Sequence, residues 1–302
     1  MRVTNPVCIF GDLGYEHGNS TESIIRNGLA GKFDFIVHVG QSAKSHPKSL
    51  CIHYASEGFD LGPVHWVALS TEYYGFYDTV GKGSLLNQLN WLQKDLELAN
   101  LNRGRIPWIV TYLHRPFYCS AAHSDDCTGF DNVMIRNGYD DMPGLEKPFL
   151  HYAVDLGFWG HVHYYERFYP VADMMYWDSA DCYHNAVAPT YVITGAAETD
   201  IEMGTLYTEK GIGDARVYKR VRADVANDVN SSTRPRGCHS TGTKIDKTPE
   251  PFSAKRLNEY GYTILTVANA THMHIEQISL DRGEAVADDF WLSKDMGFRR
   301  QK

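Results

Sequence analysis

Two histidines one residue apart are the side chains with the clearest chemical potential in this sequence. His161 and His163 lie in the segment GHVHYYER at 160–167, directly after an apolar stretch. If the backbone turns at the preceding glycine, both imidazoles can face one side and bind zinc or iron. Such a pair can also be purely structural. His272 and His274 have the same spacing, but they lie in an alternating strand without a strand-end glycine, so we expect them to be structural.

Two further residues favour the metal-binding interpretation of His161 and His163. His114 ends another apolar stretch, in TYLHRP, and Asp12 ends the first one, in FGDLG. Four candidate ligands at the ends of three predicted strands are much harder to explain by coincidence than one isolated pair. Imidazole nitrogens and a carboxylate are ligands that suit zinc and iron. The sequence therefore predicts a metal site built from these four residues.

The elements that must position these residues alternate between strands and helices. Apolar runs predict buried strands at 6–10, 33–40, 64–70, 107–113, 154–159 and 190–195. Helical spacing of apolar residues predicts helices at 20–30, 84–100 and 144–153, and Ser, Thr and Glu at the start of the first favour an N-cap. Buried strands separated by helices indicate an α/β fold. In such folds, ligands bind at the carboxyl ends of the strands, where the candidate residues lie.

The C-terminal third has a different pattern. Residues 205–258 are polar and charged and indicate a long excursion or a partly disordered segment. Residues 260–280 alternate between apolar and polar and predict a terminal β-hairpin.

Composition narrows the classes of protein further. The 302 residues are 43% hydrophobic and carry a formal charge of −8, so the chain is globular and is not expected to bind nucleic acid or anionic membranes. No apolar run approaches the roughly 18–20 residues needed to span a bilayer. The six cysteines form no C-x-x-C pair, but Cys119 and Cys127 are close enough to bridge a short loop.

Glycosylation motifs point weakly to a secreted protein. The pattern N-x-[ST] occurs at Asn19, Asn230 and Asn269, and we take Asn230 and Asn269 as candidate glycosylation sites. The N-terminus shows no signal peptide, which leads us to expect that the chain lacks its natural beginning.

Taken together, these motifs resemble those of the purple acid phosphatases, a branch of the calcineurin-like metallophosphoesterases. The family pattern consists of the blocks D-x-G, G-D-x-x-Y, G-N-H, V-x-x-H and G-H-x-H. Asp12 begins a match to the first block, His114 in TYLHRP corresponds to the histidine of the fourth, and residues 160–163 match the fifth. Segments 260–262, 269–272 and 288–291 are similar to the family's C-terminal hairpin, so the resemblance covers almost the whole chain.

The resemblance implies one metallophosphoesterase domain over residues 1–302. Its fold would be an α/β sandwich of two mixed sheets flanked by helices, with a C-terminal β-hairpin region at about 258–298. The implied activity is that of an acid phosphatase, which hydrolyses phosphate monoesters by attack of a metal-bound hydroxide. The implied location is secreted, extracellular or lysosomal, and the implied protein is a glycoprotein.

The resemblance also assigns roles to single residues. Asp12 and His163 would bind Fe(III), and His114 and His161 would bind a divalent ion, which can be Zn, Mn or Fe. His123, nine residues after His114, would be a catalytic histidine that faces the substrate, and a solvated loop histidine is an equal alternative.

The pattern breaks after the predicted strand at 33–40. Gln41 stands where the family has a bridging Asp, Lys44 stands where it has a ligand Tyr, and the G-N-H block is missing from 41–63. A neutral amide cannot bridge two cations as a carboxylate does. Because the G-N-H block is missing, we expect that the segment after residue 40 is shortened relative to the family. The alternative function is a catalytically impaired or inactive homologue that keeps the fold and at most one metal. Residues 11–15 also satisfy G-D-x-x-Y as a bare pattern, but a helix and the strand at 33–40 follow them, so they are the first block and we expect Tyr15 to be a loop aromatic rather than an iron ligand.

Overall fold

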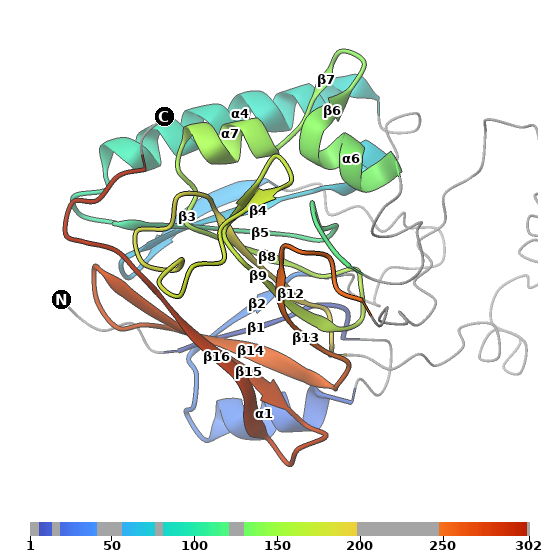
Figure 1. Ribbon diagram of the computed structural model, residues 1–302, viewed down its shortest axis with the longest axis vertical. Helices are drawn as coiled ribbons and strands as arrows, with labels where there is room; N and C mark the ends of the chain where they lie inside the picture. The colour runs from blue at the N-terminus through green and yellow to red at the C-terminus, as the bar shows by residue number, and fades with distance from the viewer. Residues whose placement is uncertain are drawn as a thin grey trace, which may run out of the picture.

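Two mixed β-sheets pack face to face, with helices on their outer sides, in the computed structural model of the chain (Figure 1). This arrangement confirms the predicted α/β sandwich. The structure describes residues 6–13, 19–40, 56–75, 81–120, 130–197 and 248–300.

The larger sheet has seven strands in the order β13-β9-β12-β8-β5-β4-β3. Its central strands β4, β5, β8 and β12 are parallel, so their carboxyl ends meet at one edge. The outer strands β3, β9 and β13 pair antiparallel to their neighbours. The strand bounds are β3 (Glu57–Leu61), β4 (Val64–Leu69), β5 (Trp108–Leu113), β8 (Leu156–Trp159), β9 (Tyr165–Phe168), β12 (Thr190–Thr194) and β13 (Ser253–Leu257).

The smaller sheet has five strands in the order β16-β15-β14-β1-β2. Strands β1 and β2 are parallel, and the other neighbours are antiparallel. The strand bounds are β1 (Val7–Phe10), β2 (Phe35–His38), β14 (Gly261–Val267), β15 (His272–Ser279) and β16 (Ala285–Ser293). Strand β1 therefore brings the N-terminal segment beside strands from the far end of the chain.

The helices cover the outer faces of both sheets (Figure 1). Helix α1 (Thr21–Leu29) covers the five-stranded sheet, whereas α4 (Lys82–Leu101), α6 (Phe130–Asn137) and α7 (Glu146–His151) cover the seven-stranded sheet. The remaining short elements are α2 (Glu72–Gly75), the hairpin of β6 (Gly138–Tyr139) with β7 (Met142–Pro143), and the hairpin of β10 (Val171–Ala172) with β11 (Met175–Tyr176).

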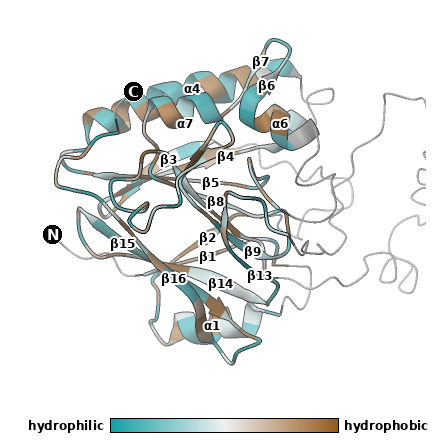
Figure 2. Ribbon diagram, in the orientation of Figure 1, coloured by the Kyte–Doolittle hydropathy of each residue, from teal (hydrophilic) through white to brown (hydrophobic). Residues whose placement is uncertain are grey.

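Helix α4 shows how the sequence pattern creates this layering. Leu85, Leu89, Leu92 and Leu96 recur at helical spacing and are all buried against the seven-stranded sheet. Figure 2 shows the resulting alternation of hydrophobic and hydrophilic segments along α4. Each fully buried leucine contributes about 1.5–3 kcal/mol relative to exposure, which holds the helix on the sheet. A second core fills the space between the two sheets.

Three predictions about individual elements differ from the structure. The segment 253–257, expected to belong to a polar excursion, forms strand β13, while residues 198–247 lie outside the described ranges. The predicted terminal hairpin at 260–280 is present as β14 and β15, but β16 extends it to three strands. Ser20 occupies the N-cap position of α1 without a side-chain cap, because its hydroxyl donates to the carbonyl oxygen of Gly261 instead.

Candidate metal and phosphate site

The four predicted ligands lie at the carboxyl ends of strands from both sheets. Asp12 follows β1 of the five-stranded sheet, His114 follows β5, and His161 and His163 follow β8. Strands β5 and β8 are parallel neighbours, so their ends reach the same edge. The backbone N–H of Gly160 donates to the carbonyl oxygen of His114 over 3.0 Å and fixes the two strand ends together.

The backbone is unusual at two of these residues. Asp12 has φ 51° and His161 has φ 70°, both in the left-handed region. Such conformations cost about 1–3 kcal/mol each in non-glycine residues and gather at functional sites. The sequence pattern predicts a turn at Gly160, whereas the left-handed residue is His161. Gly160 is needed for a different reason, because a Cβ there would lie 2.4 Å from the carbonyl oxygen of Val39.

Three of the predicted ligands are in direct contact. The backbone N–H of His161 donates to Asp12 Oδ2 over 2.6 Å. Asp12 Oδ1 lies 3.7 Å from His114 Nδ1, and His114 Nε2 lies 3.2 Å from His161 Nδ1. Asp12 and His161 are each only 5% exposed. His163 lies near enough for its charge to act on Asp12.

The carboxyl group of Asp12 remains ionised despite its burial. Burial alone raises the pKa of Asp12, but the positive charges of His114, His163 and His161 and the hydrogen bond from the His161 backbone lower it below its ordinary value. Asp12 is therefore in the deprotonated form that binds metal ions.

A buried ion pair borders these ligands. Arg115 Nε donates to Glu72 Oε1 over 2.8 Å, and Arg115 Nη1 lies 3.3 Å from His161 Nε2. Both side chains are less than one-tenth exposed. Burial raises the pKa of Glu72, but Arg115, His114 and His161 together hold it below its ordinary value.

Sequence reasoning assigned no role to either member of this pair. Glu72 begins α2, just after the carboxyl end of β4, and Arg115 directly follows His114. Asp12 and His114 were predicted because they are polar residues just after the carboxyl ends of strands. The same signal applies to Glu72, so the position of Glu72 was open to prediction.

The two contacting imidazoles have a spacing that suits one divalent ion. Two nitrogens bound to a tetrahedral zinc at about 2.0–2.1 Å each are about 3.3 Å apart. The separation of 3.2 Å between His114 Nε2 and His161 Nδ1 agrees with that value. The other nitrogen of His114 lies 3.4 Å from the carbonyl oxygen of Val39, which is the type of partner that metal-binding histidines use.

Among the described residues, His114 and His161 form a pair of ligands that suits a divalent ion. Over the described ranges, no group of three or more His, Cys, Asp or Glu side chains is arranged to hold a metal ion. The pair of His114 and His161 thus has suitable chemistry and spacing for a divalent ion, and Asp12 lies beside it with one oxygen held by the backbone.

Several sequence predictions fall outside the described ranges. These are the assignments for Tyr15, Gln41, Lys44, His123, Cys127 and Asn230. Cys119 is disulfide-bonded. Asn269 is exposed between β14 and β15, and its side-chain oxygen accepts hydrogen bonds from Thr271.

The second histidine pair lies on the surface of the five-stranded sheet. His274 stacks on Trp291 with ring centroids 4.4 Å apart, and its Nε2 lies 3.2 Å from Asp289. These contacts agree with the structural role expected for His272 and His274.

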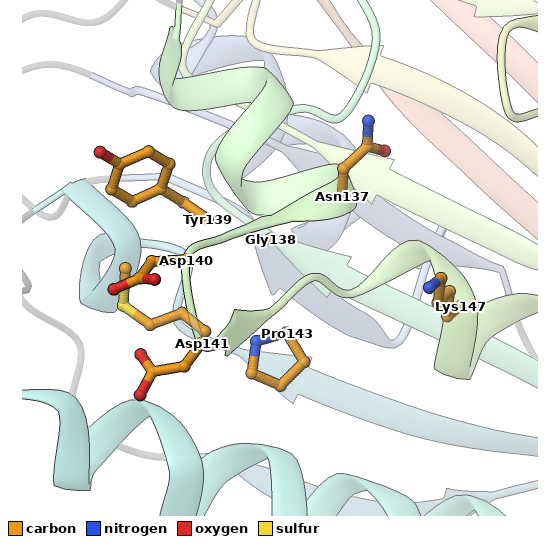
Figure 3. A pocket seen from close by; sticks show the side chains of 8 residues that line it. Asn137, Gly138, Tyr139, Asp140, Asp141, Pro143 and Lys147 are labelled. Carbon is orange, nitrogen blue, oxygen red and sulfur yellow. The ribbon is translucent and has the colours of Figure 1, made fainter.

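A pocket of about 380 Å³ lies away from the predicted ligands, at the turn between β6 and β7 (Figure 3). Residues 137–143 and Lys147 line it, and Figure 3 shows Asp140 and Asp141 projecting from the turn. None of the four predicted ligands lines this pocket. The candidate metal site is therefore identified by the chemistry of its side chains and not by a cavity. Among the helices that the structure describes, none has the length and apolar character to cross a membrane.

Known proteins are similar to this chain in sequence. Residues 237–289 match the family of iron/zinc purple acid phosphatase-like protein C. The chain is 30% identical to acid phosphatase type 7 of Mus musculus over 336 aligned positions, which cover 96% of this chain and 68% of the relative. It is 29% identical to Fe(3+)-Zn(2+) purple acid phosphatase 12 of Arabidopsis thaliana, over 68% of this chain and 34% of the relative.

Solved structures give the same fold. Purple acid phosphatase PPD1 from yellow lupin (Lupinus luteus) superimposes with a TM-score of 0.63 and 17% identity, covering 96% of this chain and 54% of that chain. GAP50, described as the anchor in the inner membrane complex of Plasmodium, has a TM-score of 0.54 and 10% identity over 97% of this chain and 92% of that chain.

The chain belongs to the purple acid phosphatase family, a family of phosphomonoesterases. Iron with a divalent metal ion is the cofactor pair expected from the family, as the name of the Arabidopsis relative indicates. The alignment with the mouse relative extends over 336 positions, more than the 302 residues of the chain. The relative therefore has residues in the aligned region that have no counterpart here.

Proposed function

We propose that this chain hydrolyses phosphate monoesters at the cluster of Asp12, His114, His161 and His163. The observation that carries the proposal is the approach of His114 Nε2 to within 3.2 Å of His161 Nδ1, beside the ionised carboxylate of Asp12. When bound, iron and a divalent metal ion would neutralise charge on the phosphoryl oxygens and assist the attack of water on phosphorus.

The residues of the chain have separate tasks in this proposal. His114 and His161 hold the divalent ion, and Asp12 and His163 hold the iron. The hydrogen bond from the His161 backbone to Asp12 ties the two strand ends together, so both halves of the site keep their spacing. His123 would have the catalytic role that the family resemblance implies.

Hydrolysis of p-nitrophenyl phosphate at acidic pH tests this proposal. The full chain is purified, supplied with iron and zinc, and compared with His161→Ala. His272→Ala is the matched control, because that histidine is exposed and lies on the far strand β15. We expect turnover by the wild type and the control and a loss of at least about 100-fold in His161→Ala. Equal turnover by the wild type and His161→Ala would contradict the proposal.

A second candidate function is that of an impaired or inactive homologue that keeps at most one metal ion. Three observations favour it: Gln41 replaces the bridging Asp of the family pattern, the mouse relative has additional residues in the aligned region, and the described part of the chain has no larger ligand group. Elemental analysis of purified protein separates the two functions. Two bound metal ions per chain support the phosphatase, and one or none supports the impaired homologue.

We also propose that the protein is secreted, extracellular or lysosomal and carries N-linked glycans. The support is the exposure of Asn269 between β14 and β15 and the second motif at Asn230.

A further inference from the structure

Glu72 has a carboxylate of which only one oxygen is used. Its side chain is 4% exposed, and Oε1 accepts the hydrogen bond of Arg115 Nε. Among the described residues, Oε2 is buried and has no hydrogen-bond partner. A buried acceptor without a partner is costly, about 1–3 kcal/mol and more for a charged group, so its presence beside the candidate site requires a physical reason.

The hydrogen bonds of His161 define where its proton lies. A guanidinium group can only donate, so at 3.3 Å from Arg115 Nη1 the Nε2 of His161 accepts. The proton of a neutral His161 is then on Nδ1, which faces His114 Nε2 at 3.2 Å. In this state the two imidazoles hydrogen-bond to each other, and Nδ1 is not available as a metal ligand.

Metal binding reverses this arrangement. When His161 Nδ1 binds a metal ion, its proton moves to Nε2, because a neutral imidazole carries one proton. Nε2–H and Arg115 Nη1–H are then two donors that face each other, and their contact at 3.3 Å is no longer favourable. His161 needs an acceptor at this position instead of Arg115.

We propose that Glu72 is a positioning residue that supplies this acceptor: its unused Oε2 accepts the hydrogen bond of His161 Nε2 when Nδ1 holds the divalent ion. One guanidinium group contacts both Glu72 and His161, and in this proposal it leaves His161 when Glu72 Oε2 takes its place. Glu72 Oε1 stays paired with Arg115, and the buried guanidinium keeps its counter-charge. A carboxylate behind a metal-binding histidine fixes the ring and its proton and strengthens metal binding.

Zinc binding by purified full-length chain tests this inference, which rests on the proposed function. Titration with zinc alone is compared between the wild type and Glu72→Gln. We expect about 10–100-fold weaker binding in the variant, because an amide oxygen is a weaker acceptor than a carboxylate. Glu146→Gln is the matched control: this buried carboxylate pairs with Tyr118, and the substitution should leave zinc affinity unchanged.

Arg115→Met distinguishes positioning from a purely structural ion pair. Removing the competing donor leaves Glu72 able to pair with His161, so zinc affinity should stay the same or rise. A purely structural pair would make Arg115→Met as harmful to zinc binding as Glu72→Gln, and that result would overturn the inference. The double variant Glu72→Met/Arg115→Met removes both buried charges, and it should lose about 10–100-fold in zinc affinity even if Glu72→Gln folds poorly.

The outcomes separate the inference from the proposed function. If the wild type does not bind zinc, both fail. If the wild type and Glu72→Gln bind zinc equally well, the inference alone fails and the proposed function stands.

Discussion

Replacing Asp155 by Asn tests how the strands that carry His114 and His161 are anchored at their opposite ends. Asp155 directly precedes β8, and its Oδ2 accepts hydrogen bonds from Arg103 Nη1 over 2.6 Å and from the backbone N–H of Ile109 in β5 over 2.8 Å. Its Oδ1 accepts from Lys294 Nζ over 3.0 Å. The carboxylate thus joins β5, β8, the end of α4 and the C-terminal segment.

The pKa of Asp155 gives the size of the expected effect. Burial raises this pKa, but Arg103, Lys294, the Ile109 backbone and Arg300 outweigh burial and lower it from 3.8 to about 2. That difference corresponds to about 2.5 kcal/mol of stability at neutral pH. The Asn variant also leaves Arg103 and Lys294 buried without their carboxylate, which adds to the loss. We expect the free energy of unfolding to fall by about 2.5–4 kcal/mol at pH 7.

Urea unfolding followed by tryptophan fluorescence at pH 7 and at pH 2–3 measures this effect. A carboxyl group whose pKa is lowered by folding stabilises the protein above its unfolded pKa, and this stability is lost as the pH falls through the folded value. The difference between wild type and Asp155→Asn should therefore shrink below about pH 4. Asp60→Asn, at a carboxylate that is 47% exposed, should cost far less. A loss below about 1 kcal/mol at pH 7, or one that does not change with pH, would refute the reasoning.

Three further predictions concern other parts of the molecule. Burial lowers the pKa of His65, but both ring nitrogens contact carboxylates, at 2.7 and 2.9 Å, and these contacts raise its pKa above the ordinary value. His65→Asn should therefore lower the free energy of unfolding more at pH 6 than at pH 9, and equal costs in urea unfolding would contradict this. Tyr191→Phe should keep or raise the melting temperature, because among described residues its buried hydroxyl has no partner, whereas Tyr165→Phe removes a 2.9 Å hydrogen bond and should lower it. Asn269→Gln should remove one glycan from protein secreted by eukaryotic cells, detected by mass spectrometry, and an unchanged mass would exclude this site.

The residues at the site were predictable where a buried strand runs straight into them. Strands β1, β5 and β8 are continuous apolar runs, and the next polar residues are Asp12, His114 and the segment 160–163. Local sequence is enough in these cases, because ligands in α/β folds bind at the carboxyl ends of the strands. Glu72 was missed because it pairs with Arg115, 43 residues away in the chain, and Arg115 in turn contacts His161, a further 46 residues away.

Two of the missed strands, β3 and β13, have the same type of cause. Strands β3 (EGFDL) and β13 (SAKRL) are sheet edges with mixed polar and apolar residues, so neither shows a continuous apolar run. Strand β13 pairs with β9, which lies far away in the sequence, and such pairing leaves little local pattern. The predicted side-chain N-cap of α1 is absent for a similar reason, because the Ser20 hydroxyl donates to the carbonyl oxygen of Gly261, 241 residues away in the sequence.

The central claim is that His114 and His161 hold one divalent ion together. The most direct measurement is the free energy of zinc binding to the wild type, to His114→Ala, to His161→Ala and to the double variant, with His272→Ala as control. If both imidazoles bind one ion, each single variant should lose nearly as much zinc affinity as the double variant, and the control should bind like the wild type. Wild-type zinc affinity in either single variant, or losses that simply add in the double variant, would contradict the claim.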